Sequence, residues 1–399
     1  MKIVHVNNKF HFLGGTEQYL YNICSVLRLM GHKNIVLHDE SNSGTHFDIA
    51  DKKYAVPFLD NFDRHLRGKL QSQIKSIVNR EKPDLIYLHN IHNPYVVEVL
   101  TDLRPVVKYV HDHELYCPKT NRLLNDSLCR NRAPIKCIIN AFRGDGYRCM
   151  GRRTQPLTIG KKIRQMLKNR SVHRKIEKFI VASQHMKQNL LSFGYHRKEI
   201  EILPYFTEIC KKATPKNGEK TILFVGRIFP EKGIDLLINS LSLLKENFHF
   251  MIIGDGNPDY VNTLHQKIER TRLDDRTTFV GWIDNCYLDK YYNKAALLVV
   301  PSLWPEPFGI VGIEAMSHGL PVVAFNVGGI SEWLEDNKTG FLIERGDINT
   351  FAQRVDLLLK DRSLRIEFGQ NAYQRALTLY NKENHIKRLV SIFYEVINS

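Results

Sequence analysis

The stretch PSLWPEPFGIVGIEAMSHGLP, residues 301–321, indicates a fold more clearly than any other part of this sequence. It follows the apolar run AALLVV, typical of a buried parallel strand, and from Gly309 onward apolar residues recur at helical spacing. Glu306 is therefore expected in a strand-to-helix loop and Glu314 inside the helix. Because the N-terminus of a helix carries free N–H groups that favour an anion, the pattern indicates an anionic ligand with hydroxyl groups, such as a nucleotide.

Two glutamates with this spacing are, taken alone, most often solvated surface residues. A second loop suited to an anion, GRIFPEKG at residues 226–233, favours a ligand site, because it also connects an expected strand to an expected helix. Retaining glycosidases pair carboxylates as well, but they have no need of phosphate-binding loops. The two loops together therefore favour a phosphate-bearing ligand.

The second half of the chain repeats one pattern, in which a short apolar strand runs into a loop and then a helix. Expected strands cover residues 221–225, 249–253, 278–280, 297–300 and 321–325. The repetition predicts an α/β domain with a doubly wound parallel sheet whose ligand loops lie along one edge.

The first half follows a similar pattern less regularly. Expected strands cover residues 2–6, 34–38, 84–89, 106–110 and 179–182. A helix is expected at residues 16–30, after the pair Gly14-Gly15, and glycines at such a turn serve either close approach to a ligand or packing alone. His111 and Asp112 end one strand at the edge where open α/β sheets hold ligands, although a histidine there is more often structural than catalytic.

Length and composition are those of an ordinary globular protein. The 399 residues suffice for two or three domains, and residues 210–220 are expected to form a linker between them. The sequence has no apolar run of about 18 residues and opens directly on an expected strand, so we expect a cytoplasmic protein that spans no membrane.

The net charge of +15 is concentrated in one segment. Residues 104–220 contain 26 lysines and arginines against 9 acidic residues, which accounts for the whole excess. Nucleic acid, an anionic membrane surface or a phosphorylated substrate would explain it. The sequence has no nucleic-acid-binding motif, so no nucleic-acid partner is expected. Peripheral association of residues 143–178 with the inner face of an anionic membrane, and plain solubility, both stay open.

An irregular basic stretch, residues 113–155, interrupts the first half and holds four of the seven cysteines. Cys117, Cys129, Cys137 and Cys149 are separated by eleven, seven and eleven residues. Four thiolates could hold such a loop around a structural zinc ion. Because the spacing is not that of a short zinc knuckle, free thiols and disulfides or redox switching stay open beside structural zinc.

These motifs resemble the retaining glycosyltransferases of family 4, which have the GT-B fold. The donor-binding half of that family is similar to GRIFPEKG, IGDGNPDY and PEPFGIVGIEAMSHGLPVVAFNVGG, and its N-terminal half to FLGGTEQYLYNI and the His111-Asp112 pair. The resemblance implies two Rossmann-like domains with doubly wound parallel sheets that face each other across a cleft. The expected boundaries are 1–210 for an acceptor-side domain with the insert 113–155, 215–380 for a donor domain, and 381–399 for a C-terminal helix packing back toward the N-terminal domain.

The resemblance also implies roles for the four expected catalytic residues, His111, Arg227, Lys232 and Glu306. Arg227 and Lys232 would neutralise the diphosphate leaving group. Glu306 would hold the transferred sugar, and His111 would contact its hydroxyl groups.

Further residues are expected to bind the donor without taking part in the chemistry. Glu314 would accept hydrogen bonds from the ribose, and Gly14 and Gly15 would let a loop approach the diphosphate. The backbone at Phe308, Gly309 and Ile310 would hold the sugar. Residues near the base would be Gly254, Asp255 and Gly256.

The function implied is transfer of a sugar, with retention, from a nucleotide-sugar donor to a cell-surface glycan or lipid-linked acceptor. A UDP-sugar is the expected donor, and neither a cofactor nor a divalent metal is expected in catalysis. A synthase-like or phosphorylase-like GT-B enzyme and a non-catalytic nucleotide-sugar or anionic-surface binding protein are the alternatives. One departure from the family is Tyr205, which stands where an asparagine often follows the proline, so the sugar-side contacts there stay open.

Overall fold

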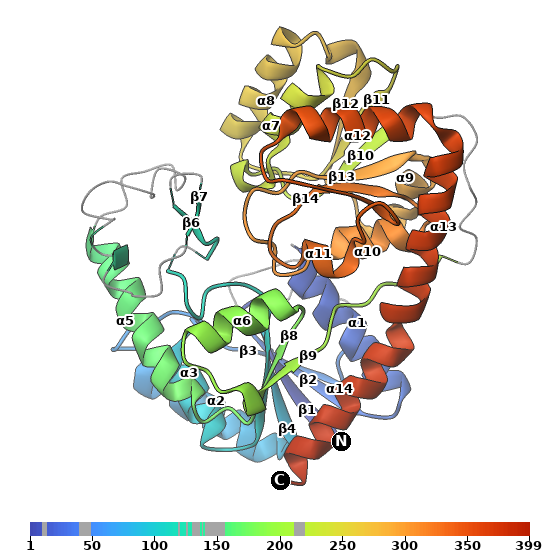
Figure 1. Ribbon diagram of the computed structural model, residues 1–399. Coiled ribbons are helices and arrows are strands. Elements are labelled where there is room, and N and C mark those ends of the chain that lie inside the picture. Colours follow the sequence, from blue (N-terminus) through green and yellow to red (C-terminus); the bar gives the residue numbers. More distant parts are fainter. Residues whose placement is uncertain are drawn as a thin grey trace. The chain divides into compact units, whose positions relative to one another are not determined.

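The computed structural model describes residues 1–9, 14–39, 49–118, 120–124, 127–129, 136–137, 139, 156–210 and 220–399. In it the chain forms two compact units (Figure 1). Unit 1 comprises residues 1–204 and 385–399, and unit 2 comprises residues 205–384. The chain therefore passes between the units twice, after Pro204 and after Asn384.

Unit 1 is built on a parallel sheet of seven strands in the order β3-β2-β1-β4-β5-β8-β9. The strands are β1 (Lys2–Val6), β2 (Lys33–His38), β3 (Lys52–Ala55), β4 (Leu85–Leu88), β5 (Val106–Val110), β8 (Lys178–Val181) and β9 (Ile200–Ile202). β4 and β5 are wholly buried, as expected of parallel strands covered on both faces. The strand order reverses between β1 and β4, which is where open α/β sheets bind ligands.

The helices of unit 1 are α1 (Gly15–Leu29), α2 (Arg67–Glu81), α3 (Pro94–Thr101), α5 (Pro156–His173), α6 (Gln184–Ser192) and α14 (Lys382–Ile397), the last of which begins in unit 2. Side-chain caps fix where α3 and α6 begin, since Asn93 accepts from the Tyr95 N–H and Ser183 from the Met186 N–H. Two short strands, β6 (Leu123–Leu124) and β7 (Ser127–Leu128), pair antiparallel within the expected insert.

Unit 2 is built on a parallel sheet of six strands in the order β12-β11-β10-β13-β14-β15. The strands are β10 (Thr221–Val225), β11 (His249–Ile253), β12 (Thr277–Gly281), β13 (Leu297–Val300), β14 (Val322–Phe325) and β15 (Gly340–Ile343). The order reverses between β10 and β13, so the loops after these two strands border the crevice of this sheet.

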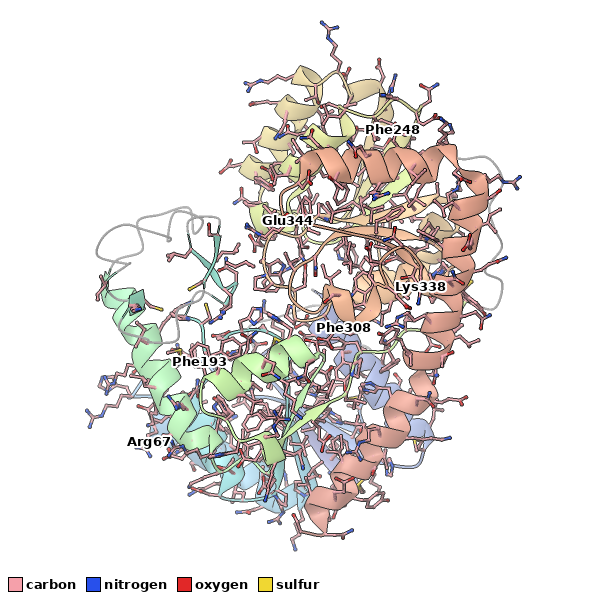
Figure 2. All side chains as sticks on the ribbon, viewed as in Figure 1. Arg67, Phe193, Phe248, Phe308, Lys338 and Glu344 are labelled. Atoms are coloured by element: carbon pink, nitrogen blue, oxygen red, sulfur yellow. The ribbon has the colours of Figure 1, made fainter. Side chains whose placement is uncertain are left out.

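The helices of unit 2 are α7 (Ile234–Leu241), α8 (Pro258–Arg270), α9 (Asp289–Lys294), α10 (Ile310–Ser317), α11 (Ile330–Trp333), α12 (Ile348–Lys360) and α13 (Arg362–Leu379). Side chains fill the space between these helices and the sheet (Figure 2). Trp333 is the largest wholly buried side chain, and its indole packs against α10, where a Cβ at Gly312 would lie 2.2 Å from the ring.

The predicted fold class, a doubly wound parallel α/β sheet in each half, is confirmed. Two elements have no clear signal in the sequence. β3 is a short, mostly solvated edge strand. The buried face of α13 includes Gly369, Ala372 and Ala376, and such small residues give no apolar stripe in the sequence. They do allow close packing, since a Cβ at Gly369 would lie 2.2 Å from the Gly319 carbonyl oxygen.

Candidate active site

The loop between β13 and α10 carries Glu306 as the sequence predicts, and its carboxylate pairs with Lys232. The Lys232 Nζ donates to Glu306 Oε1 at 2.6 Å, and the Ser302 hydroxyl donates to the same oxygen at 2.6 Å. Glu306 is buried. Burial alone would raise the pKa of its carboxyl, but the Lys232 charge and these hydrogen bonds hold the pKa below its ordinary value. The group is therefore a charged carboxylate with a fixed direction.

Backbone contacts hold the Glu306 loop against the loop that follows β14. The Gly329 N–H donates to the Glu306 carbonyl oxygen at 2.8 Å. Gly328 has φ of 60°, and a Cβ there would lie 2.2 Å from the same oxygen. A side chain at position 328 would therefore displace Glu306, which gives the glycine pair NVGG a physical reason.

The GRIFPEKG loop packs directly on the loop that follows β13. The Leu303 N–H donates to the Glu231 carbonyl oxygen at 2.8 Å. Gly233 has φ of 71°, and a Cβ there would lie 2.0 Å from the Pro301 carbonyl oxygen. These contacts are what bring Lys232 to Glu306. Arg227 lies exposed in the same loop, with its guanidinium over the Phe229 ring at 5.4 Å.

The loop after β11 joins the same edge of the sheet. The Ile228 N–H donates to the Asp255 carbonyl oxygen at 2.8 Å. A Cβ at Gly254 would lie 1.9 Å from the Gly226 carbonyl oxygen, and one at Gly256 would lie 2.0 Å from the Ile228 carbonyl oxygen. Both glycines are thus required by contact between two loops. The predicted donor loops of unit 2 therefore meet at the carboxyl edge of one sheet.

At the start of α10, Gly309 has φ of 94°, which places the residue in the left-handed region that favours glycine. The Phe308 carbonyl oxygen, one residue earlier, accepts from the Trp333 indole at 2.6 Å. The Phe308 side chain, labelled in Figure 2, is buried. The backbone from Phe308 to Ile310 is therefore rigidly presented where the helix begins.

Glu314 lies inside α10, as predicted, and has a partner that the sequence does not reveal. Tyr292 on α9 donates its hydroxyl to Glu314 Oε2 at 2.9 Å. Burial raises the pKa of the Glu314 carboxyl, and the Tyr292 hydrogen bond acts in the opposite direction. Tyr292 is buried and its ring stacks on His318 at 5.0 Å. No motif marks Tyr292, because its role depends on contact between two helices far apart in sequence.

In unit 1, Gly14 and Gly15 stand at the start of α1. Gly14 has an extended backbone, and a Cβ there would meet nothing nearer than Glu17 Oε2 at 3.7 Å. The packing of the described residues therefore does not require a glycine at position 14, in contrast to Gly328 in unit 2.

His111 follows β5 and is buried. Its Nε2 lies 3.2 Å from His89 Nδ1, and its ring stacks on Tyr109 at 4.6 Å. Burial, followed by the charges of Lys108 and His92, holds the pKa of His111 well below its ordinary value. The imidazole is therefore neutral at physiological pH.

Three of the four insert cysteines fall within the described residues, and Cys149 lies outside them. Cys117 is buried, while Cys129 and Cys137 are half-buried. Burial, together with the nearby Cys117 and Cys129, raises the pKa of the Cys137 thiol to about 11. Within the described residues the three thiols do not form a group whose ligand atoms all lie within 4.8 Å of one another, and a structural zinc ion there stays a prediction.

The basic helix α5 packs against α3 and buries part of its apolar face. Ile163 and Met166 are buried, and Leu167 is half exposed. No helix within the described part of the chain is long and apolar enough to cross a bilayer. Association with anionic lipid stays a prediction, and the buried face of α5 takes no part in it.

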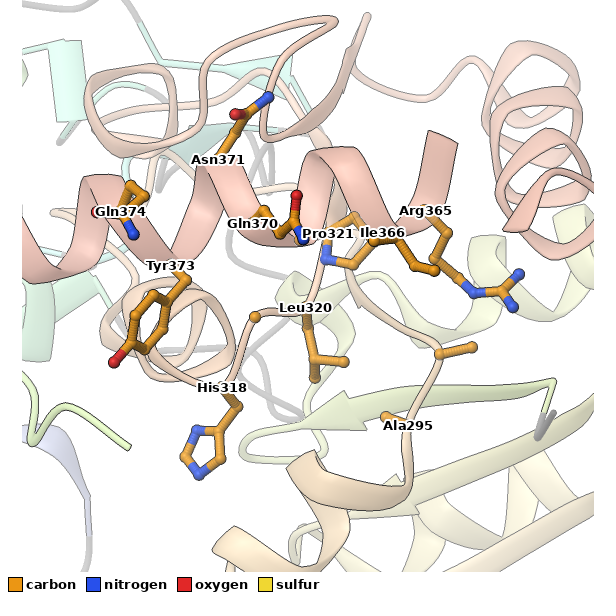
Figure 3. Close-up of a pocket in the computed structure, with 13 residues that line it drawn as sticks. Ala295, His318, Leu320, Pro321, Arg365, Ile366, Gln370, Asn371, Tyr373 and Gln374 are labelled. Atoms are coloured by element: carbon orange, nitrogen blue, oxygen red, sulfur yellow. The ribbon is translucent and has the colours of Figure 1, made fainter. Parts of the chain in front are cut away.

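A cavity in unit 2 lies between α13 and the loops that precede β13 and β14 (Figure 3). Its lining includes Ala295, His318, Leu320, Gln370 and Tyr373. Because those loops precede their strands, this cavity is at the amino edge of the sheet. The predicted donor loops are at the opposite, carboxyl edge, so this cavity is not the candidate site.

Two family models together match residues 13–375, which is most of the chain. The family described as Glycosyltransferase Family 4 matches residues 13–208, and the family described as Glycosyl transferases group 1 matches residues 206–375. Similar proteins include an uncharacterized glycosyltransferase of Methanocaldococcus jannaschii, 32% identical over 178 residues, which are 45% of each chain. N-acetyl-alpha-D-glucosaminyl L-malate synthase of Bacillus anthracis is 27% identical over 198 residues, 48% of this chain and 49% of that protein. The matches thus span about half the length of these relatives.

Solved structures resemble the chain over nearly its whole length. HepE of Anabaena, in complex with UDP and glucose, has a TM-score of 0.75 at 19% identity and covers 99% of this chain and 100% of its own. Sucrose-phosphate synthase of Thermosynechococcus elongatus has a TM-score of 0.75 at 20% identity and covers 100% and 99%. At such identities the likeness is one of fold, and that fold is GT-B. The chain belongs to the family 4 glycosyltransferases.

Proposed function

We propose that this protein is a retaining glycosyltransferase that moves a sugar from a UDP-sugar donor to a glycan or lipid-linked acceptor. The observation that carries the proposal is the Lys232–Glu306 pair, a half-buried ammonium on a buried carboxylate, held where three loops meet at the carboxyl edge of the unit 2 sheet. HepE was solved with UDP and glucose and also with UDP-glucose, which supports a uridine donor.

The chemistry follows from charge. Cleavage of a sugar–phosphate bond leaves negative charge on the diphosphate and positive charge on the sugar. The Lys232 ammonium, the Arg227 guanidinium and the N-terminus of α10 would stabilise the leaving group as its charge grows. Because protein cations supply this charge, no divalent metal is needed at the diphosphate.

The two glutamates would divide the donor between them. Glu306 would accept hydrogen bonds from sugar hydroxyls while keeping Lys232 aimed at the phosphate. Glu314, oriented by Tyr292, would accept from the ribose hydroxyls. In unit 1, neutral His111 would contact the sugar, and the departing phosphate oxygen would take the acceptor proton, so no separate general base is required.

The test is a panel of UDP-, GDP- and ADP-sugars, each scored by thermal shift and by release of the nucleotide diphosphate. We expect UDP and a UDP-sugar to raise the melting temperature, because a ligand that binds only the folded state stabilises it. Turnover should persist in EDTA, and NMR of the product should show the anomeric configuration of the donor sugar.

Binding without release of UDP, under any acceptor supplied, would favour a non-catalytic nucleotide-sugar binding protein. A product with inverted configuration would refute the retaining mechanism but would still support transferase activity. No thermal shift with any of the nucleotides would remove the basis of the proposal.

A further inference from the structure

One imidazole and three carboxylates form a compact cluster in unit 1 that the proposed donor chemistry does not use. The members are Asp60, His92, Asp112 and Glu114, called here the His92 cluster. His92 follows β4, and Asp112 and Glu114 follow the neighbouring strand β5. The cluster therefore lies at the carboxyl edge of the unit 1 sheet, the edge at which open α/β sheets hold ligands.

The spacing of these side chains suits a single ion. His92 Nδ1 lies 3.1 Å from Glu114 Oε2 and 3.5 Å from Asp60 Oδ2, and His92 Nε2 lies 4.0 Å from Asp112 Oδ1. One ligand atom each from His92, Asp112 and Glu114 can be chosen so that all lie within 4.8 Å of one another. Atoms that share an ion at about 2.1 Å lie roughly 3 to 4 Å apart. Small side-chain rotations would bring the three ligand atoms to the distances that a shared ion requires.

Hydrogen bonds already fix the backbone that carries the cluster. Asp60 Oδ1 accepts from the N–H of His92 at 2.6 Å and from that of Asn93 at 2.9 Å. Asp112 Oδ1 accepts from the Glu114 N–H at 2.8 Å. Such supporting contacts are what orients metal ligands in known sites. The His92 side chain is 8% exposed and the carboxylates are 20 to 33% exposed, so the cluster is open to solvent on its acidic side.

One buried side chain of helix α5, Asn169, contacts the backbone of the cluster and has a polar atom without a partner in the part of the chain that the structure describes. Asn169 donates its amide to the His92 carbonyl oxygen at 2.6 Å, while its own Oδ1 has no partner among the described residues. Buried polar atoms normally have partners, so a hydrated ion nearby is one way to satisfy the Asn169 oxygen.

We propose that His92, Asp112 and Glu114 bind a divalent cation, with Asp60 as a further carboxylate of the site. A mixed imidazole and carboxylate set favours Mn²⁺ or Zn²⁺ over Ca²⁺. The ion would fix the loops after β4 and β5 relative to each other. The site belongs to unit 1 alone, so it stands or falls independently of the donor chemistry in unit 2.

The same geometry has a simpler explanation, in which a protonated His92 sits between carboxylates and no ion binds. Mn²⁺ distinguishes the two, because it prefers oxygen and nitrogen ligands and so is not captured by the insert thiols. The experiment titrates metal-free full-length protein with MnCl₂ and follows the loss of the free-ion signal by electron paramagnetic resonance. We expect one Mn²⁺ per chain.

The variants Asp112→Asn and Glu114→Gln keep side-chain shape and remove a charged ligand. Each should weaken Mn²⁺ binding about tenfold or more. Asp102→Asn and Glu98→Gln are matched controls in the same unit, on or next to α3, and should bind as the unaltered protein does. Circular dichroism and thermal melting confirm that each variant folds. No Mn²⁺ binding up to about 1 mM, or equal binding in all four variants, would overturn the proposal.

Discussion

The carboxyl edges of the two sheets are built in different ways. In unit 2, backbone touches backbone: Gly233, Gly254, Gly256 and Gly328 each stand where a Cβ would fall within about 2.2 Å of a carbonyl oxygen. In unit 1, side chains make the contacts at this edge, through stacked histidines and tyrosines and through the His92 cluster. Backbone contacts admit only glycine and so leave a recognisable string in the sequence. Many combinations of side chains can pack equally well, so side-chain packing leaves a weaker pattern in the sequence.

The largest expected effect is at the Lys232–Glu306 pair. Lys232→Met should lower kcat about 100- to 1,000-fold, because it removes a cation preorganised for the leaving group. The measurement is release of UDP at saturating donor. Lys360→Ala, an exposed lysine at the end of α12, is the control and should leave kcat unchanged.

The double variant Lys232→Met, Glu306→Gln shows whether the Lys232–Glu306 pair serves only the stability of the fold or also the reaction. It replaces a partly buried ion pair by a neutral pair of similar shape, so the melting temperature should recover relative to Lys232→Met alone. Turnover should not recover. If it does, the pair only supports the fold and the proposed roles of Lys232 and Glu306 are wrong.

Two glycine-to-alanine changes test the contrast between the units directly. Gly328→Ala forces a Cβ onto the Glu306 backbone at positive φ, so we expect a loss of roughly 2–4 kcal/mol in unfolding free energy. Gly14→Ala has room for its Cβ and should cost no more than about 1 kcal/mol, the scale of an N-cap change. Denaturant unfolding gives both numbers.

If Gly14 serves the donor diphosphate, Gly14→Ala should nevertheless reduce turnover while the fold is kept. Unchanged turnover in a stable Gly14→Ala protein would contradict the role assigned to that loop. A large loss of stability would instead show that the chain itself requires the glycine.

A pH effect is expected from unit 1. Burial lowers the pKa of His5 and of His385 to about 4, so the unfolded chain binds more protons than the folded one between pH 4 and 6.5. Above pH 6.5 both histidines are neutral in the folded and the unfolded chain, so they cause no loss of stability. As pH falls toward 4, protonation of the unfolded chain lowers the free energy of unfolding. Each histidine should cost about 2 kcal/mol at pH 5.

The three tryptophans, Trp282, Trp304 and Trp333, all lie in unit 2, which allows the two units to be followed separately. At pH 5 the circular dichroism transition should begin at a lower temperature than the tryptophan fluorescence transition. Superimposed transitions at pH 5 and pH 7.5 would show that acid does not weaken unit 1 selectively.

The smallest expected effect is at Tyr292. Tyr292→Phe removes the hydroxyl that orients Glu314, so the Kd for UDP should rise about five- to tenfold, the scale of one ordinary hydrogen bond. Calorimetric titration with UDP measures it, with the exposed Tyr287→Phe as control. An unchanged Kd would mean that Glu314 either needs no orientation or does not bind the ribose.

The sequence by itself determined the class of fold in both units, the loops that hold Lys232 and Glu306, and the helix that holds Glu314. It could do so because parallel strands buried on both faces are apolar runs and because tight loop contacts demand glycine. Helix α13 escaped detection because its buried face includes glycine and alanine that give no apolar period.

Only the tertiary structure decided which side chains become partners. Tyr292 meets Glu314, and His92 meets Asp112 and Glu114, through contacts between elements separated by about 20 residues or more. The local spacing of residues in the sequence does not predict these contacts, because they depend on how strands and helices pack. Charge pairing and burial, which set the chemistry of these groups, are therefore properties of the fold.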